Sequence, residues 1–288
     1  MVSPWLAAGG ALGAAAVTLQ LGRYFWAASA AFRPRRGAVD KPVALAAVSG
    51  TRDVILRTPA GLALRGWYLP SRNRAALVLG HGSRANRAAL AAEAALFADH
   101  GYGVLLFDFP GHGESEGRVH WDAGERAALT SALDFLAEQP DVDPSRLGVY
   151  GFSMGGFIAS QVAPDEPRVR ALALIAAPTS MNEVLRWQYR VRGPFSYVPA
   201  LAAFHVHGVK LAFDVRSAVR HFTGRPLLIA AGDADSVVPP RMARELYAAA
   251  GSPKQLHMVA GAGHGGYVQH DPAFGPTLLE FFERALGR

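Results

Sequence analysis

The stretch Gly151-Phe152-Ser153-Met154-Gly155 places a serine between two glycines, directly after an apolar run. Residues 146–150 favour a buried β-strand and residues 156–162 favour a buried helix. On so tight a strand-to-helix turn the serine is forced toward positive φ, and its hydroxyl stands out above the sheet. Side chains two residues to either side would collide there, which explains the two glycines. The pattern therefore predicts that Ser153 is a nucleophile.

This nucleophile elbow resembles that of the α/β-hydrolase superfamily, in which an acid and then a histidine follow the serine along the chain. Residues 226–231 form a strongly apolar strand that runs into Gly232-Asp-Ala-Asp-Ser-Val-Val-Pro239. That segment looks like the acid loop of the family, and the resemblance gives the acid role to Asp235. Asp233 is the alternative, and its ordinary interpretation is a turn residue that binds nearby backbone amides.

The expected base follows in the same order. Residues 254–259 predict the next strand, which ends in Gly261-Ala-Gly-His-Gly-Gly-Tyr267. From this glycine-flanked loop the imidazole of His264 can reach across the top of the sheet. His257 lies inside the strand and His270 at the start of the last helix, so both are expected to be structural.

An oxyanion hole needs two backbone N–H groups that point at the developing negative charge. One is expected from Met154, the residue after the nucleophile, at a helix N-terminus. The predicted strand 75–79 leads into His81-Gly82, which resembles the His-Gly dipeptide of the family and gives the second donor role to Ser83. The segment Asp108–Ser115 also resembles a loop common in this superfamily.

Composition limits the chemistry. The chain has 288 residues and no cysteine, which excludes disulfides, thiol catalysis and cysteine-ligated metals. No histidine or acidic spacing suggests a metal centre, and the glycine loops lack the lysine of a phosphate-binding loop, so no metal and no cofactor are expected. The formal charge is +6, from 29 basic and 23 acidic residues. Nucleic-acid binding is the weaker interpretation, because several positive charges cluster near the N-terminus, at Arg23, Arg33, Arg35, Arg36 and Lys41.

The N-terminal run predicts a membrane anchor over residues 1–32. Residues 1–22 carry no charged side chain, and Pro4 to Phe25 exceeds the ~20 helical residues that span hydrocarbon. A cleaved signal peptide with the site Ala28-Ser29-Ala30 is the alternative, although no Lys or Arg precedes the apolar run. Because the basic residues follow the run, the positive-inside rule predicts a single N-terminal transmembrane helix with a cytoplasmic catalytic domain.

The rest of the chain predicts one α/β domain. Residues 33–50 form a linker, and residues 51–288 form an α/β-hydrolase domain that begins with a hairpin. Strands and helices then alternate, which favours a mostly parallel central sheet with helices on both faces. The alternation breaks at about 179–216, where the family commonly carries a small helical cap. Its aromatic residues form either an apolar roof over an acyl pocket or an ordinary packing surface.

The resemblance is closest to the Bem46-like and serine-aminopeptidase-like groups, whose members include esterases and lipases that act on acylglycerols. It implies a carboxylic-ester hydrolase with an acyl-enzyme intermediate, similar to a lysophospholipase or a monoacylglycerol lipase. The expected partners are a small-molecule or lipid ester and the membrane. A peptidase or amidase and an acyltransferase with the same triad are the alternatives. A non-catalytic binding member of the fold is disfavoured, because such proteins usually lose a triad residue.

Overall fold

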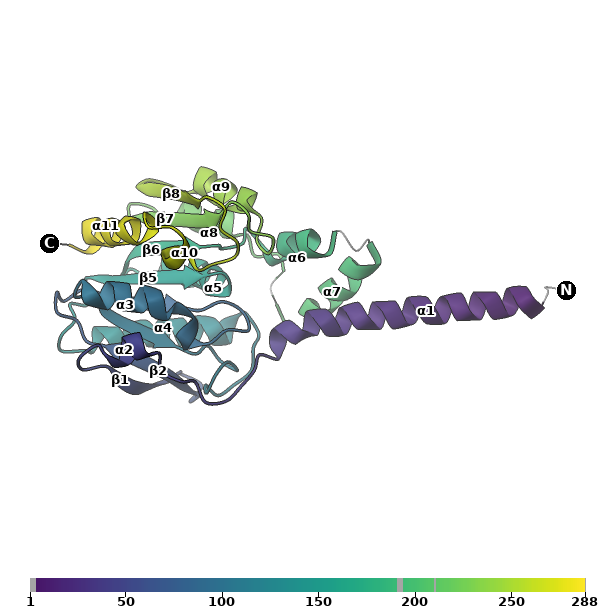
Figure 1. The fold of residues 1–288 in the computed structure, drawn as a ribbon, viewed down its shortest axis with the longest axis horizontal. Coiled ribbons are helices and arrows are strands. Elements are labelled where there is room, and N and C mark those ends of the chain that lie inside the picture. The colour runs from purple at the N-terminus through teal and green to yellow at the C-terminus, as the bar shows by residue number, and fades with distance from the viewer. Residues whose placement is uncertain (1–3, 191–193, 210, 288) are drawn as a thin grey trace.

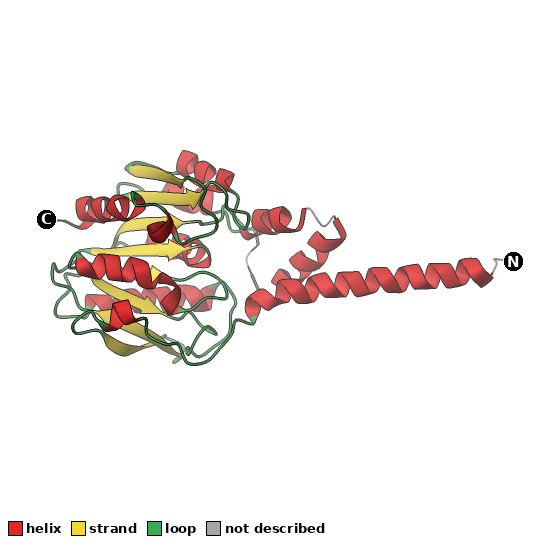
Figure 2. Cartoon of the chain, viewed as in Figure 1, coloured by secondary structure: helices red, strands yellow, loops and turns green. Residues whose placement is uncertain are grey.

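The computed structural model describes residues 4–190, 194–209 and 211–287. In this part of the chain, eight strands form one sheet in the order β1-β2-β4-β3-β5-β6-β7-β8. The β1–β2 and β2–β4 pairs are antiparallel and the other neighbours are parallel (Figures 1 and 2). The strands are β1 (Arg52–Arg57), β2 (Ala63–Leu69), β3 (Ala76–Gly80), β4 (Gly103–Phe107), β5 (Leu147–Phe152), β6 (Val169–Ile175), β7 (Leu227–Gly232) and β8 (Lys254–Val259).

Helices cover both faces of this sheet. The α-helices are α1 (Pro4–Ser29), α2 (Val43–Ala46), α3 (Ala91–Asp99), α4 (Ala123–Ala137), α5 (Met154–Val162), α6 (Met181–Tyr189), α7 (Pro194–Val206), α8 (Val215–His221), α9 (Pro240–Ala249), α10 (Tyr267–His270) and α11 (Phe274–Leu286). Short 3-10 helices are η1 (Ala30–Phe32), η2 (Arg87–Leu90) and η3 (Ala163–Asp165).

The core is divided by the sheet. Along β5, Leu147 and Val149 belong to one buried cluster and Tyr150 to the other, as the alternation of side chains in a strand requires. Residues of α4 and α5 fill the first cluster, and residues of α3 and α11 fill the second. The predicted α/β-hydrolase sheet, mostly parallel and covered on both faces, is therefore confirmed.

The predicted transmembrane helix is wrong. Within the described residues, no helix is both long and apolar enough to cross a membrane. α1 has 26 residues, but alanine and glycine make up much of it, and Gln20 and Arg23 interrupt it. Small side chains remove little apolar area from water, so such a helix gains little from hydrocarbon. The structure therefore does not support the predicted membrane anchor. The membrane as a partner and the localisation were deduced from that anchor, and they are not supported either.

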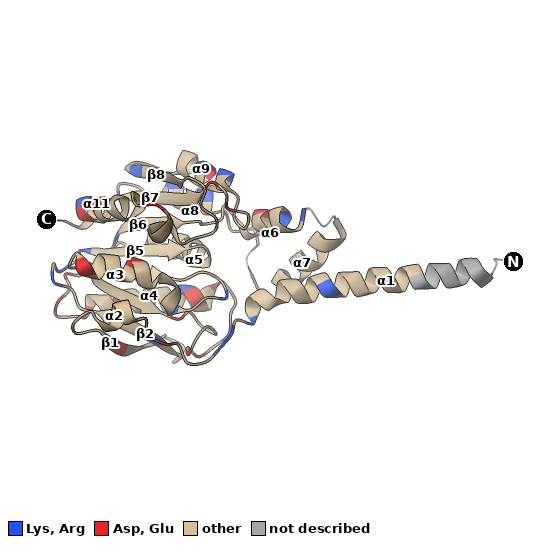
Figure 3. Cartoon of the chain, in the orientation of Figure 1, with Lys and Arg blue, Asp and Glu red and all other residues tan. Residues whose placement is uncertain are grey.

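The C-terminal end of α1 packs against the rest of the protein. It lies beside α7, and few charged residues occur along α7 and the coloured part of α1 (Figure 3). Ala28 is 3% exposed, and the Phe32 ring lies 4.8 Å from the Phe204 ring and 6.3 Å from the Trp121 ring. This aromatic cluster joins η1, α7 and the loop before α4. The end of α1 is thereby fixed above the carboxyl edge of the sheet.

A buried ion cluster holds the loop that follows β4. Arg87 is 4% exposed, and its guanidinium contacts the fully buried carboxylate of Asp108 and the carboxylate of Glu114. The guanidinium also lies over the Trp67 ring, 4.6 Å from its centre. Burial raises the pKa of Asp108, against the pull of Arg87. Removing one partner of such a cluster leaves a carboxyl group in the interior without its counter-charge.

We expect Arg87→Gln to lower the free energy of unfolding by about 3–5 kcal/mol, as for other broken buried ion pairs. The control is Arg241→Gln, which removes an exposed pair with Glu245 and should cost about 0.5 kcal/mol or less. Urea unfolding of the two variants, followed by circular dichroism, measures the difference. Equal losses in both variants would show that the buried cluster contributes no more than a surface pair.

Candidate active site

Ser153 lies on the sharp turn between β5 and α5, with a φ of 51°. The flanking glycines are required by close contacts. A Cβ on Gly155 would lie 2.1 Å from the carbonyl oxygen of Gly80, and one on Gly151 would lie 2.7 Å from the carbonyl oxygen of Gly155. The structure therefore has the strand–turn–helix geometry that the sequence predicts, with the serine held at the carboxyl edge of the sheet.

Three of the predicted residues come together at this edge. His264 Nε2 lies 2.9 Å from Ser153 Oγ, and His264 Nδ1 lies 2.6 Å from the Asp235 carboxylate. Asp235 is 3% exposed and also accepts hydrogen bonds from the backbone N–H groups of Val237 (2.7 Å) and Val238 (2.9 Å). An ionised carboxylate only accepts hydrogen bonds, so the Nδ1–H of His264 donates to it and Nε2 is free to accept the serine proton. The arrangement can deprotonate Ser153.

The alternative residues have other partners. Asp233 accepts a hydrogen bond from the Gly261 N–H (2.7 Å), at the start of the loop that carries His264. His257 pairs with Asp271 at 3.0 Å, and His270 Nε2 lies 3.1 Å from the carbonyl oxygen of Ala260. These contacts agree with the structural roles that the sequence predicts for the three residues.

His81 orients the peptide group that contains the Ser83 amide. Its ring is fully buried, Nε2 accepts a hydrogen bond from the Phe109 N–H (3.1 Å), and Nδ1 lies 2.8 Å from the Gly82 carbonyl oxygen. Burial lowers the pKa of His81 to about 4, so the ring is neutral and Nδ1 carries its proton. In a trans peptide the C=O and N–H groups point in opposite directions. Fixing the Gly82 carbonyl therefore fixes the direction of the Ser83 N–H.

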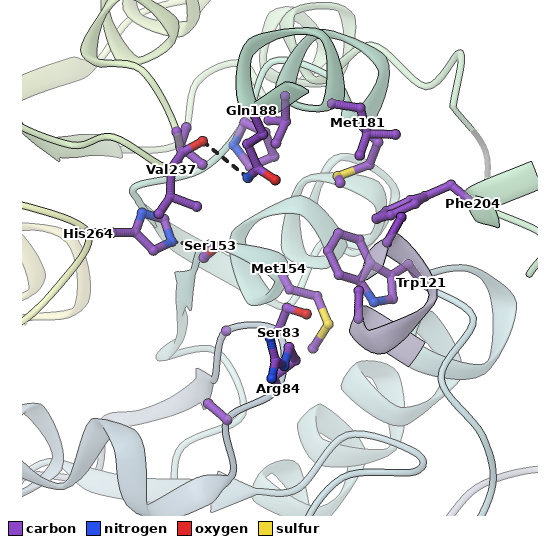
Figure 4. Close-up of a pocket in the computed structure, with 18 of the residues that line it drawn as sticks. Ser83, Arg84, Trp121, Ser153, Met154, Met181, Gln188, Phe204, Val237 and His264 are labelled. Carbon is purple, nitrogen blue, oxygen red and sulfur yellow. Dashed lines mark hydrogen bonds between the residues drawn. The ribbon is translucent and has the colours of Figure 1, made fainter. Parts of the chain in front are cut away.

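A cavity of about 380 Å³ opens above Ser153. Figure 4 shows Met154 and Ser83 on one side of the serine, and Gln188 and Val237 across the cavity. The backbone N–H of Met154 is in the first turn of α5, where an amide has no acceptor within the helix. The walls are mainly apolar and come from α1, η1, the loop before α4, α6, α7 and the loop after β7: Ala27, Ala28, Ala31, Trp121, Met181, Val184, Leu185, Tyr189, Phe204, Val237 and Val238.

Sequence reasoning missed the contribution of α1 to this cavity. Ala27, Ala28 and Ala31 fall in the run that predicts an anchor, and Ala28 falls in the alternative cleavage site. The helix end is fixed by Phe32, whose ring partners lie far along the chain. No local pattern of alanines distinguishes a helix that packs over a site from a hydrophobic leader.

The sheet and the elbow are those of the α/β-hydrolase class. The esterase Pf2001 of Pyrococcus furiosus superposes with a TM-score of 0.76 at 22% identity, over 89% of this chain and 98% of that one. Est1E of Butyrivibrio proteoclasticus, solved with ferulic acid, superposes with a TM-score of 0.68 at 18% identity, over 82% of this chain and 100% of that one. At these identities the likeness establishes the fold alone.

Sequence comparison agrees with the fold. The family model for X-Pro dipeptidyl-peptidases (S15 family) matches residues 71–203. A Mycobacterium tuberculosis protein described as uncharacterised, Rv2307c, is 31% identical over 250 residues, which cover 85% of this chain and 82% of that protein. The thiohydrolase aneE of Aspergillus aculeatus is 37% identical over 125 residues, 42% of this chain and 39% of that protein. The chain therefore belongs to the same family as Rv2307c, and its fold is that of the α/β-hydrolase superfamily.

We expect a fluorophosphonate probe to label Ser153, because the hydrogen-bonded imidazole makes its oxygen nucleophilic. Ser153→Ala should not be labelled. Asp235→Asn should slow labelling by about 10⁴-fold, the loss found when a serine protease loses the acid of its triad. Labelling rates measured by in-gel fluorescence test this expectation.

Asp233→Asn is the matched control, because it removes the same charge from the same loop and should keep a nearly normal labelling rate. If Asp233→Asn lost labelling and Asp235→Asn kept it, the assignment of the acid would be wrong.

Proposed function

We propose that the protein hydrolyses carboxylic esters of apolar acyl groups through Ser153, His264 and Asp235. The observation that carries this proposal is the continuous set of contacts from Asp235 to His264 to Ser153, which ends at the floor of an apolar cavity. The cavity falls within the range of about 300–1,000 Å³ typical of small-molecule sites. Within this class, a lysophospholipase-like or monoacylglycerol-lipase-like activity is the finer proposal.

The proposed reaction has two steps. His264 Nε2 takes the proton of Ser153 as Oγ attacks the carbonyl carbon, and Asp235 stabilises the imidazolium that forms. The N–H groups of Ser83 and Met154 donate to the tetrahedral oxyanion. The imidazolium then protonates the departing alcohol as the acyl-enzyme forms. In the second step His264 deprotonates a water molecule, which attacks the acyl-enzyme and releases the acid and free Ser153.

The orientation of the Ser83 N–H supports its proposed role as a donor in the oxyanion hole. A donor contributes most when it is already oriented before charge develops, because no reorganisation is then needed. The hydrogen bond from His81 to the Gly82 carbonyl supplies this orientation. We therefore assign His81 a positioning role.

An ester fits the cavity better than a peptide with a free N-terminus. A dipeptidyl-peptidase, the activity named by the matching family model, must hold a terminal ammonium group. Among the described residues, none that lines the cavity is an aspartate or a glutamate that could pair with such a group. A fatty or aromatic acyl group, in contrast, matches the alanine and aromatic side chains of the wall.

We expect the full chain to hydrolyse p-nitrophenyl esters with an optimum in acyl length between acetyl and palmitoyl, because the cavity is apolar but finite. Ser153→Ala should lose about 10⁶-fold in kcat, as for other serine-hydrolase nucleophiles. Steady-state rates across the series measure both effects. Absence of hydrolysis across the series, with Ser153 still labelled by a fluorophosphonate, would favour the peptidase or acyltransferase alternative.

The same series tests the wall formed by the end of α1 and by η1. Ala28→Leu should move the optimum to shorter acyl groups, with kcat/KM falling about fourfold for each methylene that is excluded (~0.8 kcal/mol per CH₂). Ala31→Leu is a second variant at a half-buried position on the same wall, in case the first disturbs packing. Ala15→Leu, on the exposed part of α1, is the matched control. An unchanged optimum in both wall variants would mean that the acyl group lies elsewhere.

A further inference from the structure

One cation lies at the cavity without a partner. Among the lining residues, all of which the structure describes, Arg84 carries the only permanent charge; the others are neutral, apart from the titratable imidazole of His264. Arg84 is exposed, and no hydrogen bond or ion pair in the described part of the chain involves its guanidinium. Arg87, in contrast, is already paired with Asp108 and Glu114.

The backbone holds Arg84 in an unfavourable conformation. Its φ is 61°, in the left-handed region that costs a residue with a Cβ about 1–2 kcal/mol relative to the ordinary helical region. A glycine would remove this cost, so the strain is a reason to look for what the arginine binds. The position follows Ser83, and the two residues lie together below Met154 in Figure 4. A group bound by Arg84 would therefore lie at the wall of the cavity that also contains Ser153.

The two ends of the cavity differ in charge. Trp121 and Phe204 lie to one side of Ser153 and form an uncharged apolar wall with the end of α1. Arg84 lies at a different, solvent-exposed side. An acyl chain suits the first side, which leaves the leaving group at the second. The planar guanidinium forms paired hydrogen bonds with carboxylate and phosphate oxygens.

We infer that Arg84 binds an oxyanion, a carboxylate or a phosphate, on the leaving group of the substrate. This inference rests on the proposed function, and it narrows the substrate class from neutral esters to amphiphilic esters with an anionic alcohol. Among lipid substrates it favours a lysophospholipid with a terminal phosphate over a neutral monoacylglycerol. The chemistry of hydrolysis is unchanged: water is added, and the acid and the anionic alcohol are released.

Paired substrates with the same acyl group test the inference on the full chain. One pair is the butyrate ester of 5-hydroxy-2-nitrobenzoic acid and that of its carboxamide, which differ in one carboxylate. The second pair is 1-acylglycerol 3-phosphate and 1-acylglycerol, which differ in one phosphate. We expect wild type to favour the anionic member by up to about fivefold in kcat/KM, the upper value for an exposed ion pair (~1 kcal/mol), with the difference mainly in KM. If one pair alone shows the preference, that pair identifies whether Arg84 binds a carboxylate or a phosphate.

Arg84→Gln should abolish this preference in both pairs, and added salt should weaken it in wild type. The matched control is Arg74→Gln. Arg74 is also an exposed arginine at positive φ (69°), but it precedes β3 whereas Arg84 follows it, so it lies at the opposite end of the strand. The control should keep the anionic preference. Equal ratios in wild type and Arg84→Gln would overturn the inference.

A second measurement does not need ester turnover. Glycerol 3-phosphate should slow fluorophosphonate labelling of Ser153 in wild type and in Arg74→Gln, but not in Arg84→Gln, and glycerol should have no effect. If glycerol 3-phosphate did not slow the labelling of Ser153 in wild type, anion binding at Arg84 would be contradicted, even if no ester were hydrolysed. Protection without hydrolysis of any ester would instead contradict the proposed function and leave the anion site standing.

Discussion

The close approach of α5 to the ends of β3 and β5 is the constraint on which the site depends. Gly155 lies so near the Gly80 carbonyl, and Gly156 so near the Gly151 carbonyl, that a Cβ at either position would lie within 3 Å of an oxygen. This contact between backbones gives Ser153 its positive φ and points its side chain away from the sheet. It also brings the first amide of α5 beside the loop that follows β3. The serine and the two proposed oxyanion donors are therefore set by one packing contact.

The loops beyond the other strands complete the geometry with hydrogen bonds to the backbone. Asp235 is fixed by two amides of its own loop, and Asp233 ties that loop to the one that carries His264. His81 similarly ties its loop to the loop after β4 through the Phe109 amide. Because each of these side chains is held by a neighbouring backbone group, their positions do not depend on contacts among many side chains. The cavity above the site is different, since packing of separate helices determines its shape.

Much of the fold could be predicted from the sequence, because its signals are local. Apolar runs such as 226–231 identify buried strands, and the glycines around Ser153 report a backbone contact that leaves few alternatives. A family resemblance predicts the order of Ser153, Asp235 and His264 along the chain. The fold brings the three side chains into contact, and their catalytic roles are predictions. The position of the end of α1 could not be predicted, because hydropathy measures how apolar a segment is and not which partner covers it. Phe32 meets Phe204 only after the chain has folded. The charge of Arg84 is visible in the sequence, but its lack of a partner is visible only in three dimensions.

The order of the cavity residues along the chain determines when the site can form during protein synthesis. Ala28 precedes the serine elbow along the chain, and His264 follows it by 111 residues. Domains form during synthesis as their segments become available, beginning from the N-terminus. A growing chain can therefore expose the serine elbow and the end of α1 long before the histidine that would activate the serine has been made. If the proposed function holds, the nascent protein stays inactive toward esters in its surroundings until the loop that carries His264 has been made and has folded.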